Sequence, residues 1–440
     1  MKRSVTERLA SSIIERTISV EDCERAQLLL LDWTGCAVGG SKGLFGDNLS
    51  DVLPLKSGDC ARIGNLPAGP VLAAFHNGCL GNVLEMDDVD KRAILHAGPT
   101  IIPAALAVGE HINAAPFDVL KAIVFGYEAT IRIGRAVGAG HYAFWHNTAT
   151  CGPFGAATAA CSLLGCNESE LTSALGLVGT QSAGLWQTRH EADSKAKQIH
   201  AGHAAQIGVL SAFLAREGIQ GPRSILDGEQ GFFAAMCPGA NPEDVLKDYG
   251  PEWLIHNTSL KPYPSCRHAH PTIDAIMKSR MTVEDVKTWP IIIETYDDAL
   301  KFCDRPHPAS MQEAMFSLQH VAAVTLLGNP PILADFSEAV INDPKIMALR
   351  DKVELRASEF YQIPYPKHFG ASVSINGQIS AVKDAYGDPE NPMDEKAVIK
   401  KALSLFEYHG LSAVRANELC SAAMNFMTSG SIKHYTGHLP

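Results

Sequence analysis

Apolar residues follow a helical pattern through most of the first half of the chain. They recur every three or four positions over residues 5–18 and 21–38, and small polar residues or glycine end both segments. The later segments are rich in alanine and glycine, which let helix backbones approach closely. We therefore expect a compact bundle of largely buried helices. The later segments cover residues 71–84, 101–112, 119–137, 151–164, 168–183 and 199–215.

The pattern changes after about residue 260. Residues 290–296 and 371–382 predict strands, and Asn376-Gly377 in the second segment is typical of a tight hairpin turn. Helical spacing resumes towards the C-terminus, so an α+β module is predicted within a mainly α chain. The predicted helices of this half cover residues 311–327, 344–349, 394–407 and 412–427. The predicted domains are an all-helical one made of residues 1–262 and 395–440, and an α+β one made of residues 263–394.

Composition limits the kind of protein this is. Apolar residues make up 46% of the 440 residues and charged residues 19%, which is typical of a globular protein. The net charge of −11 argues against a general affinity for nucleic acid or anionic membranes, but allows a local basic pocket for an acidic metabolite. No signal-peptide pattern and no long apolar run is seen, and the eleven cysteines form no Cys-x-x-Cys pair. We expect reduced thiols, a cytoplasmic location and no structural metal.

Acidic and basic side chains crowd into residues 85–96, just before a predicted helix. A helix N-terminus offers unpaired N–H groups to a carboxylate substrate while a neighbouring side chain moves a proton. Glu85 and Asp88 are candidate substrate-binding residues and His96 is a candidate catalytic residue. The alternative is a solvated acidic loop in front of a core helix. The charged residues are Glu85, Asp87, Asp88, Asp90, Lys91, Arg92 and His96.

Three further clusters carry candidate chemistry. His146 follows aromatic residues and precedes a glycine-interrupted helix start, and a lone histidine there is more often structural. Lys197 and His200 stand at the head of a predicted Ala/Gly-rich helix, where spacing places them on one side. The third cluster lies between prolines, which stiffen a loop, at the junction of the two compositions, where we expect an interdomain cleft. Its candidate substrate-binding residues are Lys261, Cys266, Arg267 and His268.

Together these motifs resemble the MmgE/PrpD family. The resemblance rests on four motifs in family order: the acidic loop with His96-Ala-Gly-Pro, Trp145-His146 ahead of Gly152-Pro-Phe-Gly, Lys197-Gln-Ile-His-Ala-Gly, and Lys261-Pro-Tyr-Pro-Ser-Cys-Arg-His. It runs nearly from end to end. One departure is residues 89–91, Val-Asp-Lys, where the family's decarboxylases and dehydratases tend to carry an aromatic residue and a histidine or tryptophan.

The resemblance implies a large all-helical domain, a smaller α+β lid domain, a homodimer and no metal or organic cofactor. It also implies an active site between the domains, with His96, His146, Lys197 and Lys261 matching catalytic histidines and substrate-binding lysines. The family's chemistry is removal of a proton beside a carboxylate, or loss of that carboxylate, in small di- or tricarboxylic acids. Such carbon acids are weak, so a base and preorganised cations are both required.

One carbanion-like state leads either to an epimer or to an alkene. We favour an epimerase of an aminodicarboxylate-type acid such as iminodisuccinate, because the loop departs from the lyase pattern and no extra segment suits a larger tricarboxylate. The alternatives are a lyase of the 2-methylcitrate dehydratase or cis-aconitate decarboxylase type, and a non-catalytic polycarboxylate-binding protein. His96 and His146 are the expected acid/base pair, the acidic loop making His96 more basic and aromatic shielding lowering the pKa of His146.

Overall fold

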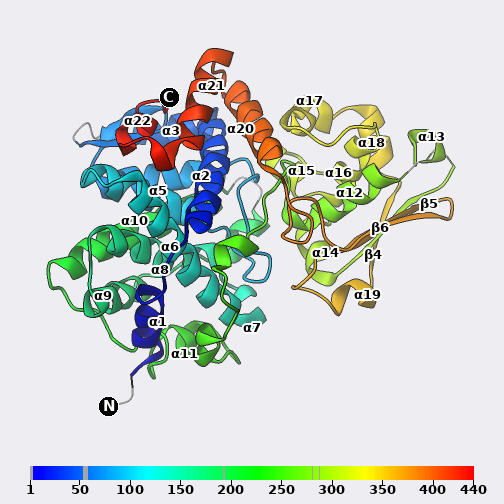
Figure 1. The fold of residues 1–440 in the computed structure, drawn as a ribbon. Coiled ribbons are helices and arrows are strands. Elements are labelled where there is room, and N and C mark those ends of the chain that lie inside the picture. Colours follow the sequence, from blue (N-terminus) through cyan, green and yellow to red (C-terminus); the bar gives the residue numbers. More distant parts are fainter. Residues whose placement is uncertain (1–2, 53–57, 192–193, 280, 287) are drawn as a thin grey trace. The chain divides into compact units, whose positions relative to one another are not determined.

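The computed structural model describes residues 3–52, 58–191, 194–279, 281–286 and 288–440, which form two compact units (Figure 1). The first unit comprises Met1–Val83, Asp87–Thr258 and Asp394–Pro440, and the second comprises Leu84–Met86 and Ser259–Met393. The predicted boundaries, 262/263 and 394/395, lie a few residues from these. The assignment of Leu84–Met86 to the second unit was not predicted. The mainly helical fold class is confirmed.

The first unit is built mainly from helices, both long and short. The predicted helices of residues 5–215 are all present, with ends that differ by a few residues. The α-helices are α1 (Val5–Ile14), α2 (Val20–Gly40), α3 (Leu44–Val52), α4 (Pro70–Gly81), α5 (Gly98–His111), α6 (Pro116–Ala136), α7 (Gly138–Tyr142), α8 (Asn147–Leu163), α9 (Glu168–Gly179), α10 (Ala196–Arg216), α11 (Phe232–Met236), α20 (Glu395–His409), α21 (Ala413–Met424) and α22 (Ile432–Thr436). Short 3-10 helices cover Trp186–His190, Pro242–Leu246, Leu254–Asn257 and Phe426–Thr428.

Helix α8 lies at the centre of this unit and packs against α5, α6, α9 and α10. Small residues make the packing possible. A Cβ atom at Gly155 of α8 would lie 2.5 Å from the carbonyl oxygen of Gly126 in α6, and one at Gly208 of α10 would lie 2.4 Å from the Cβ atom of Ala156. The Ala/Gly-rich sequence therefore sets the spacing of the helices, as expected.

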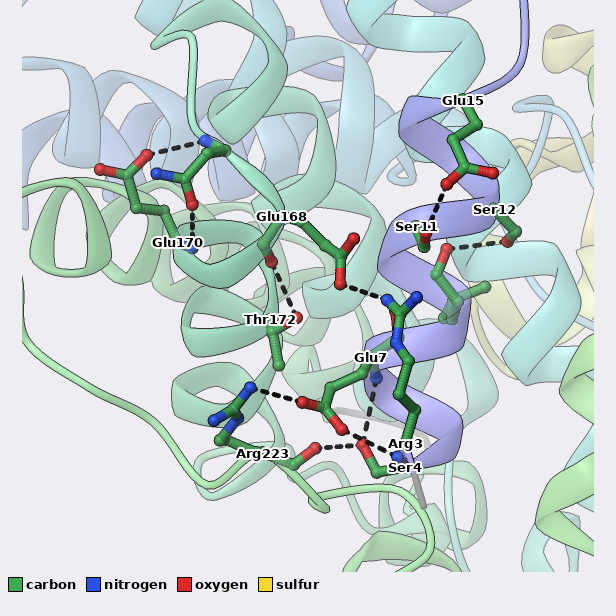
Figure 2. Close-up of polar contacts among 12 residues, drawn as sticks. Arg3, Ser4, Glu7, Ser11, Ser12, Glu15, Glu168, Glu170, Thr172 and Arg223 are labelled. Atoms are coloured by element: carbon green, nitrogen blue, oxygen red, sulfur yellow. Dashed lines mark hydrogen bonds and ion pairs between the residues drawn. The ribbon is translucent and has the colours of Figure 1, made fainter. Parts of the chain in front are cut away.

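Side-chain caps fix where α1 begins. The Oγ atom of Ser4 accepts a hydrogen bond from the Glu7 N–H group at 3.1 Å, and the Glu7 carboxylate accepts one from the Ser4 N–H group at 2.8 Å. Figure 2 shows that Arg223 joins this cap: its guanidinium contacts Glu7 at 2.6 Å, and its carbonyl oxygen accepts a bond from Ser4 Oγ at 2.6 Å. The first helix is thereby tied to a segment more than two hundred residues away.

The first unit is not purely helical, which corrects the all-helical prediction. Strands β1 (Cys60–Arg62) and β2 (Asn65–Ala68) form an antiparallel hairpin. With three and four residues, these strands are too short to produce an alternating pattern in the sequence. The Asn77 side chain holds the hairpin to α4, donating to the Ala61 carbonyl oxygen at 2.9 Å and accepting from the Ile63 N–H group at 3.0 Å.

The second unit contains a four-stranded sheet in the order β4-β3-β5-β6. Strand β3 (Ile291–Thr295) runs parallel to β4 (Val353–Ala357) and antiparallel to β5 (Ala371–Ile375), which pairs antiparallel with β6 (Gln378–Val382). The helices of this unit are α12 (His270–Lys278), α13 (Val283–Val286), α14 (Asp297–Cys303), α15 (Met311–Met315), α16 (Leu318–Thr325), α17 (Glu338–Ile341), α18 (Pro344–Arg350) and α19 (Glu359–Gln362), with 3-10 helices at Arg267–Ala269 and Leu333–Phe336.

The sequence predicted most of this sheet. Strands β3, β5 and β6 are confirmed, and so is the hairpin turn, where Asn376 and Gly377 have φ angles of 50° and 75°. Strand β4 was missed. The helix predicted over residues 311–327 is wrong in one respect, because it is two helices. Ser317 divides them, accepting from the His320 N–H group at 3.0 Å and donating to the Arg305 carbonyl oxygen at 2.6 Å.

After the second unit the chain returns to the first through α20, drawn in orange beside the blue α2 in Figure 1. The approach is close, because a Cβ atom at Gly35 of α2 would lie 3.0 Å from the Cα atom of Ala402. The eleven cysteines are free thiols, as predicted. Among the described residues, no helix combines the length and the apolar character that crossing a bilayer requires.

Candidate active site

A buried carboxylate orients the imidazole of His96. The Asp87 side chain is inaccessible to solvent, and its Oδ2 atom lies 2.8 Å from His96 Nδ1, while the His96 side chain is 14% exposed. Asn82 donates to the same carboxylate from Nδ2 at 2.8 Å. A carboxylate this close to Nδ1 stabilises the protonated imidazole and leaves Nε2 as the atom that can exchange a proton with a substrate. This arrangement suits His96 to acid/base chemistry.

The loop that carries His96 is held in a strained conformation. Ile94 has a φ angle of 51°, which a β-branched residue rarely adopts. The backbones of Asp90 and Leu95 exchange two hydrogen bonds, at 2.9 and 3.3 Å, and the Asp90 carboxylate accepts a bond from Arg135 Nη2 at 2.5 Å. Asp90 and Arg135 are buried, so this ion pair braces the loop from α6. This contact fixes the loop just before α5, where His96 lies.

Asp88, a predicted substrate-binding residue, caps α5 from within the protein. It accepts bonds from the Gly98 N–H group at 3.0 Å and from the Tyr127 hydroxyl at 3.0 Å. A Cβ atom at Gly98 would lie 2.2 Å from Asp88 Oδ1, so only glycine allows this approach. Burial, followed by the charges of Asp87 and Asp32, raises the pKa of Asp88 to about 7. A direct substrate contact for Asp88 stays a prediction.

The raised pKa of Asp88 predicts a measurable effect of pH on stability. Between about pH 4 and pH 7 the folded protein keeps a proton that the unfolded chain has lost, so this group lowers stability as pH rises through that window. We expect the unfolding free energy of Asp88→Asn, relative to wild type, to rise by on the order of 3 kcal/mol between pH 4.5 and pH 8. Urea denaturation at both pH values measures the change.

The control for this measurement is Asp118→Asn, which alters an exposed carboxylate on α6. Its stability relative to wild type should change little between the two pH values. A difference between Asp88→Asn and wild type that stays constant from pH 4.5 to pH 8 would contradict the assignment of this titration to Asp88.

Two histidines from distant parts of the chain lie next to each other at the start of α8. His146 is the residue before α8 and is buried, and its Nδ1 atom lies 3.2 Å from Nδ1 of His200 in α10. Burial, then the charges of His200, Lys197 and His96, hold the pKa of His146 well below its usual value. Burial also lowers the pKa of His200, to about 4. Both imidazoles are therefore neutral at neutral pH, and one donates to the other.

The predicted lowering of the His146 pKa is confirmed, although its aromatic neighbour is not the one expected. The sequence placed the aromatic shielding in the residues just before His146. In the structure the ring centroid of Trp186 lies 4.4 Å from that of His146. Trp186 belongs to a 3-10 helix forty residues further along the chain, so its contact with His146 depends on tertiary folding.

Lys197 lies in the first turn of α10, and its side chain is buried. Its positive charge adds to the partial positive charge of the helix N-terminus. Lys197 also contributes to lowering the pKa of both His146 and His200. A buried lysine in this position creates positive potential suited to an anionic ligand.

Three helix N-termini thus carry the candidate residues of the first unit. His96 precedes α5, His146 precedes α8 and Lys197 opens α10, and these three helices pack against one another. The ends meet: the His96 N–H group donates to Thr148 Oγ1 in the first turn of α8 at 3.0 Å, and α8 meets α10 through His146 and His200. Three partial positive charges and one lysine therefore favour a carboxylate next to histidines that can move protons.

The other candidate residues form a cluster within the second unit. Lys261 is fully buried, and its Nζ atom lies 3.6 Å from Glu85 Oε2. Glu85 has a φ angle of 53°, so its backbone is strained where the chain enters the second unit. A hydrogen bond from Cys303 lowers the pKa of the buried Cys266 thiol, and the charges of Glu85 and Lys261 act on it as well. The structure brings Glu85, Lys261 and Cys266 together.

Arg267 and His268 are engaged in the interior of the second unit. Arg267 pairs with Asp388 at 2.5 Å and donates to the Tyr386 carbonyl oxygen at 3.1 Å. His268 bonds the Tyr296 hydroxyl at 2.7 Å and stacks on Phe369 with ring centroids 5.1 Å apart, and burial lowers its pKa to about 4. These contacts favour structural roles, and substrate binding by the two residues stays a prediction.

Two groups of side chains among the described residues have the spacing to hold a metal ion. They are Asp59, Cys60 and His111 in the first unit, and His368, Asp384 and Glu390 in the second. Neither includes a predicted site residue. In the second group His368 Nδ1 lies 2.7 Å from Asp384, a distance that an ordinary ion pair explains.

Sequence reasoning left out residues that support the site. Asp87 was seen as part of the acidic loop but was not selected, although its place next to Asp88 marked it as a candidate. Trp186 lacked a local signal. The buried ion pair between Asp32 and Lys401, 2.6 Å apart, joins residues at opposite ends of the chain and could not be read from spacing.

Comparison with known proteins gives matches along most of the chain. Residues 8–244 match the MmgE/PrpD N-terminal domain, and residues 263–424 match the MmgE/PrpD C-terminal domain. The chain is 28% identical to cis-aconitate decarboxylase of Aspergillus terreus over 382 residues, which cover 80% of this chain and 77% of that protein. It is 28% identical to cis-aconitate decarboxylase of Homo sapiens over 309 residues, covering 65% and 61% of the two chains.

A second activity is found among the relatives. The chain is 24% identical over 392 residues to the mitochondrial 2-methylcitrate dehydratase of Yarrowia lipolytica, with 82% of this chain and 74% of that protein covered. Both named activities belong to lyases, which remove a group and leave a double bond or a proton in its place. The two family matches together cover most of the sequence. The first three motifs lie within the N-terminal match, and the C-terminal match begins within the fourth. This protein is an enzyme and belongs to the MmgE/PrpD family.

Proposed function

We propose that the protein is a lyase that acts on a small polycarboxylic acid by acid/base chemistry of its own side chains. The observation that carries the proposal is the Asp87–His96 couple beside the neutral His146–His200 pair and Lys197, all in one unit. This constellation supplies an oriented base, a hydrogen-bond donor and positive potential. Dehydration needs the base to take a proton from carbon, decarboxylation needs its conjugate acid to return one, and both need a donor and positive potential for the charge that develops.

In a dehydration neutral His96 takes the proton from carbon, the C–O bond breaks, and the proton is returned to the departing hydroxyl, which leaves as water. In a decarboxylation the C–C bond breaks to release carbon dioxide, and the imidazolium of His96 protonates the carbon left behind. Asp87 stabilises the imidazolium in both cases. A low-pKa neutral imidazole such as His146 donates a hydrogen bond to an oxygen on which charge develops, without becoming charged itself. Lys197 and the N-termini of α5, α8 and α10 hold the substrate carboxylates. Dehydration uses the same groups as decarboxylation, because both pass through a carbanion-like state next to a carboxylate.

The relatives support a lyase rather than the epimerase that the sequence favoured. Their names state decarboxylation of cis-aconitate and dehydration of 2-methylcitrate. We therefore propose a tricarboxylic acid as substrate. Substrate binding by Glu85, Lys261 and Cys266 stays a prediction, and a homodimer, which the family resemblance implied, is proposed as the assembly. A cytoplasmic location and independence of metals and cofactors stay predictions.

The test is proton NMR of the purified protein in deuterated water with five acids: cis-aconitate, 2-methylcitrate, citrate, malate and iminodisuccinate. A decarboxylase replaces the olefinic signal of cis-aconitate by that of an unsaturated dicarboxylic acid and releases carbon dioxide, whereas a dehydratase creates olefinic signals from the saturated hydroxy acids. Deuterium entry without net loss of substrate would identify an epimerase instead. If no acid is turned over or exchanged, the proposed function is wrong.

A further inference from the structure

A buried ion pair lies in the first unit, and neither of its residues was predicted to support the candidate site. Lys401 Nζ on α20 lies 2.6 Å from Asp32 Oδ1 on α2, and the two side chains are 4% and 1% exposed. Replacing such a pair by apolar residues is often neutral or even stabilising, because desolvation offsets the attraction between the charges. Stability alone is therefore a weak explanation for this pair.

The pair is connected to the Asp87–His96 couple through α4. Trp33, next to Asp32, packs so closely on the end of α4 that a Cβ atom at Gly81 would lie 2.5 Å from its Nε1 atom. The following residue, Asn82, donates to the Asp87 carboxylate at 2.8 Å. Asp87 in turn lies 2.8 Å from His96. Chain neighbours and close contacts thus link the ion pair to the imidazole through α4.

The charges in this interior act on one another. Burial alone would lower the pKa of Lys401, but Asp32, Cys36 and Asp87 hold it above its usual value. Burial raises the pKa of Asp32 against the opposing effect of Lys401, and Asp87 adds to the rise. The other titratable groups that act on this cluster are Arg25 and Cys36 of α2, Asp88 of the loop and Tyr127 of α6.

We propose that Lys401 and Asp32 form a positioning pair that sets the pH at which the Asp87–His96 couple takes up its proton. The cation of Lys401 favours the deprotonated couple, which can act as a base, and the anion of Asp32 limits that effect. Two charges of opposite sign in a low-dielectric interior act on a neighbouring proton in opposite directions. The proposal rests on the proposed acid/base function of His96.

The test compares Asp32→Asn, Lys401→Met, Lys401→Arg and the double variant Asp32→Asn/Lys401→Met. In Asp32→Asn the unbalanced lysine should move the limb of the pH–kcat profile that reports His96, the acidic limb in a dehydration and the alkaline limb in a decarboxylation, to lower pH. In Lys401→Met that limb should move to higher pH, and both shifts should be about one pH unit. Lys401→Arg keeps the positive charge and should leave that limb near its wild-type position. The double variant removes one charge of each sign and should also place the limb near its wild-type position.

A purely structural role would give a different result. Arg132→Met is the matched control, because it removes the cation, itself partly exposed, of another ion pair in the same unit, 2.7 Å from the buried Glu128. It is expected to lower stability without moving the limb. Shifts in the same direction for Asp32→Asn and Lys401→Met, or no shift in either variant, would overturn the proposal. Thermal melts establish that each variant is folded.

A second measurement is independent of the substrate. The His96 imidazole can be titrated by NMR in histidine-labelled protein, with its signal assigned from His96→Gln. Its midpoint should shift down in Asp32→Asn and up in Lys401→Met. If the wild-type protein acts on none of the polycarboxylic acids, the proposed function fails, but these opposite shifts would still identify the positioning pair. Unchanged midpoints in a catalytically active protein would reject the positioning pair alone.

Discussion

His96→Gln is expected to lower kcat by roughly 10²- to 10⁴-fold, the range that one positioned acid/base group contributes. Glutamine has a similar reach but cannot take up or return a proton near neutral pH. The Asp87 carboxylate lies 2.8 Å from His96 Nδ1 and stabilises the imidazolium, which suits this imidazole to carrying the proton. Steady-state kinetics on whichever acid the NMR screen identifies measures the loss, which should appear in kcat more than in KM.

Two further variants make this prediction specific. Asp87→Asn keeps the shape of the side chain but removes the charge that stabilises the imidazolium, so a loss on the order of 10²-fold is expected. His111→Gln alters an exposed histidine at the C-terminal end of α5, the helix that His96 precedes, and should leave kcat unchanged. If His96→Gln keeps wild-type turnover while folded, His96 is not the base and the proposed mechanism is wrong.

The sequence predicted the elements that have strong local signals. The helical period identified α2, α6 and α8, and Asn376-Gly377 identified the β5–β6 hairpin, because positive φ angles at both turn positions favour these residues. Strand β4 was missed because it is half-exposed and its apolar residues alternate with charged ones over only five positions. The break at Ser317 was missed because the cap involves Arg305, a partner distant in sequence.

The candidate site was predictable where its residues precede helices. His96, His146 and Lys197 stand at helix starts that glycine, proline and small residues mark in the sequence, and folding brings these starts together. Their supporting residues were not predictable. Trp186 reaches His146, and Lys401 reaches Asp32, only through the packing of distant segments. Sequence spacing carries no information about such contacts.

The same limit applies to the residues of the second unit. Lys261, Cys266, Arg267 and His268 look equivalent in the sequence, as a cation-rich loop between prolines. In the structure Arg267 is bound to Asp388, and His268 is stacked among aromatic rings, whereas Lys261 and Cys266 lie near Glu85. Residues of one motif thus have different neighbours in the folded protein. The sequence does not show which of them are engaged in internal contacts, and the structure does.

Lys197→Ala is expected to lower kcat/KM by about 3 kcal/mol, or roughly 150-fold, the effect of losing one preorganised donor for developing charge. The reason is its place in the first turn of α10, buried and beside His146 and His200, where the helix dipole already favours an anion. Lys195→Ala is the matched control, because it removes the same charge from an exposed position two residues earlier. Steady-state kinetics of both variants measures the difference. An unchanged kcat/KM in Lys197→Ala, or an equal loss in Lys195→Ala, would show that general positive potential and not the Lys197 ammonium holds the substrate.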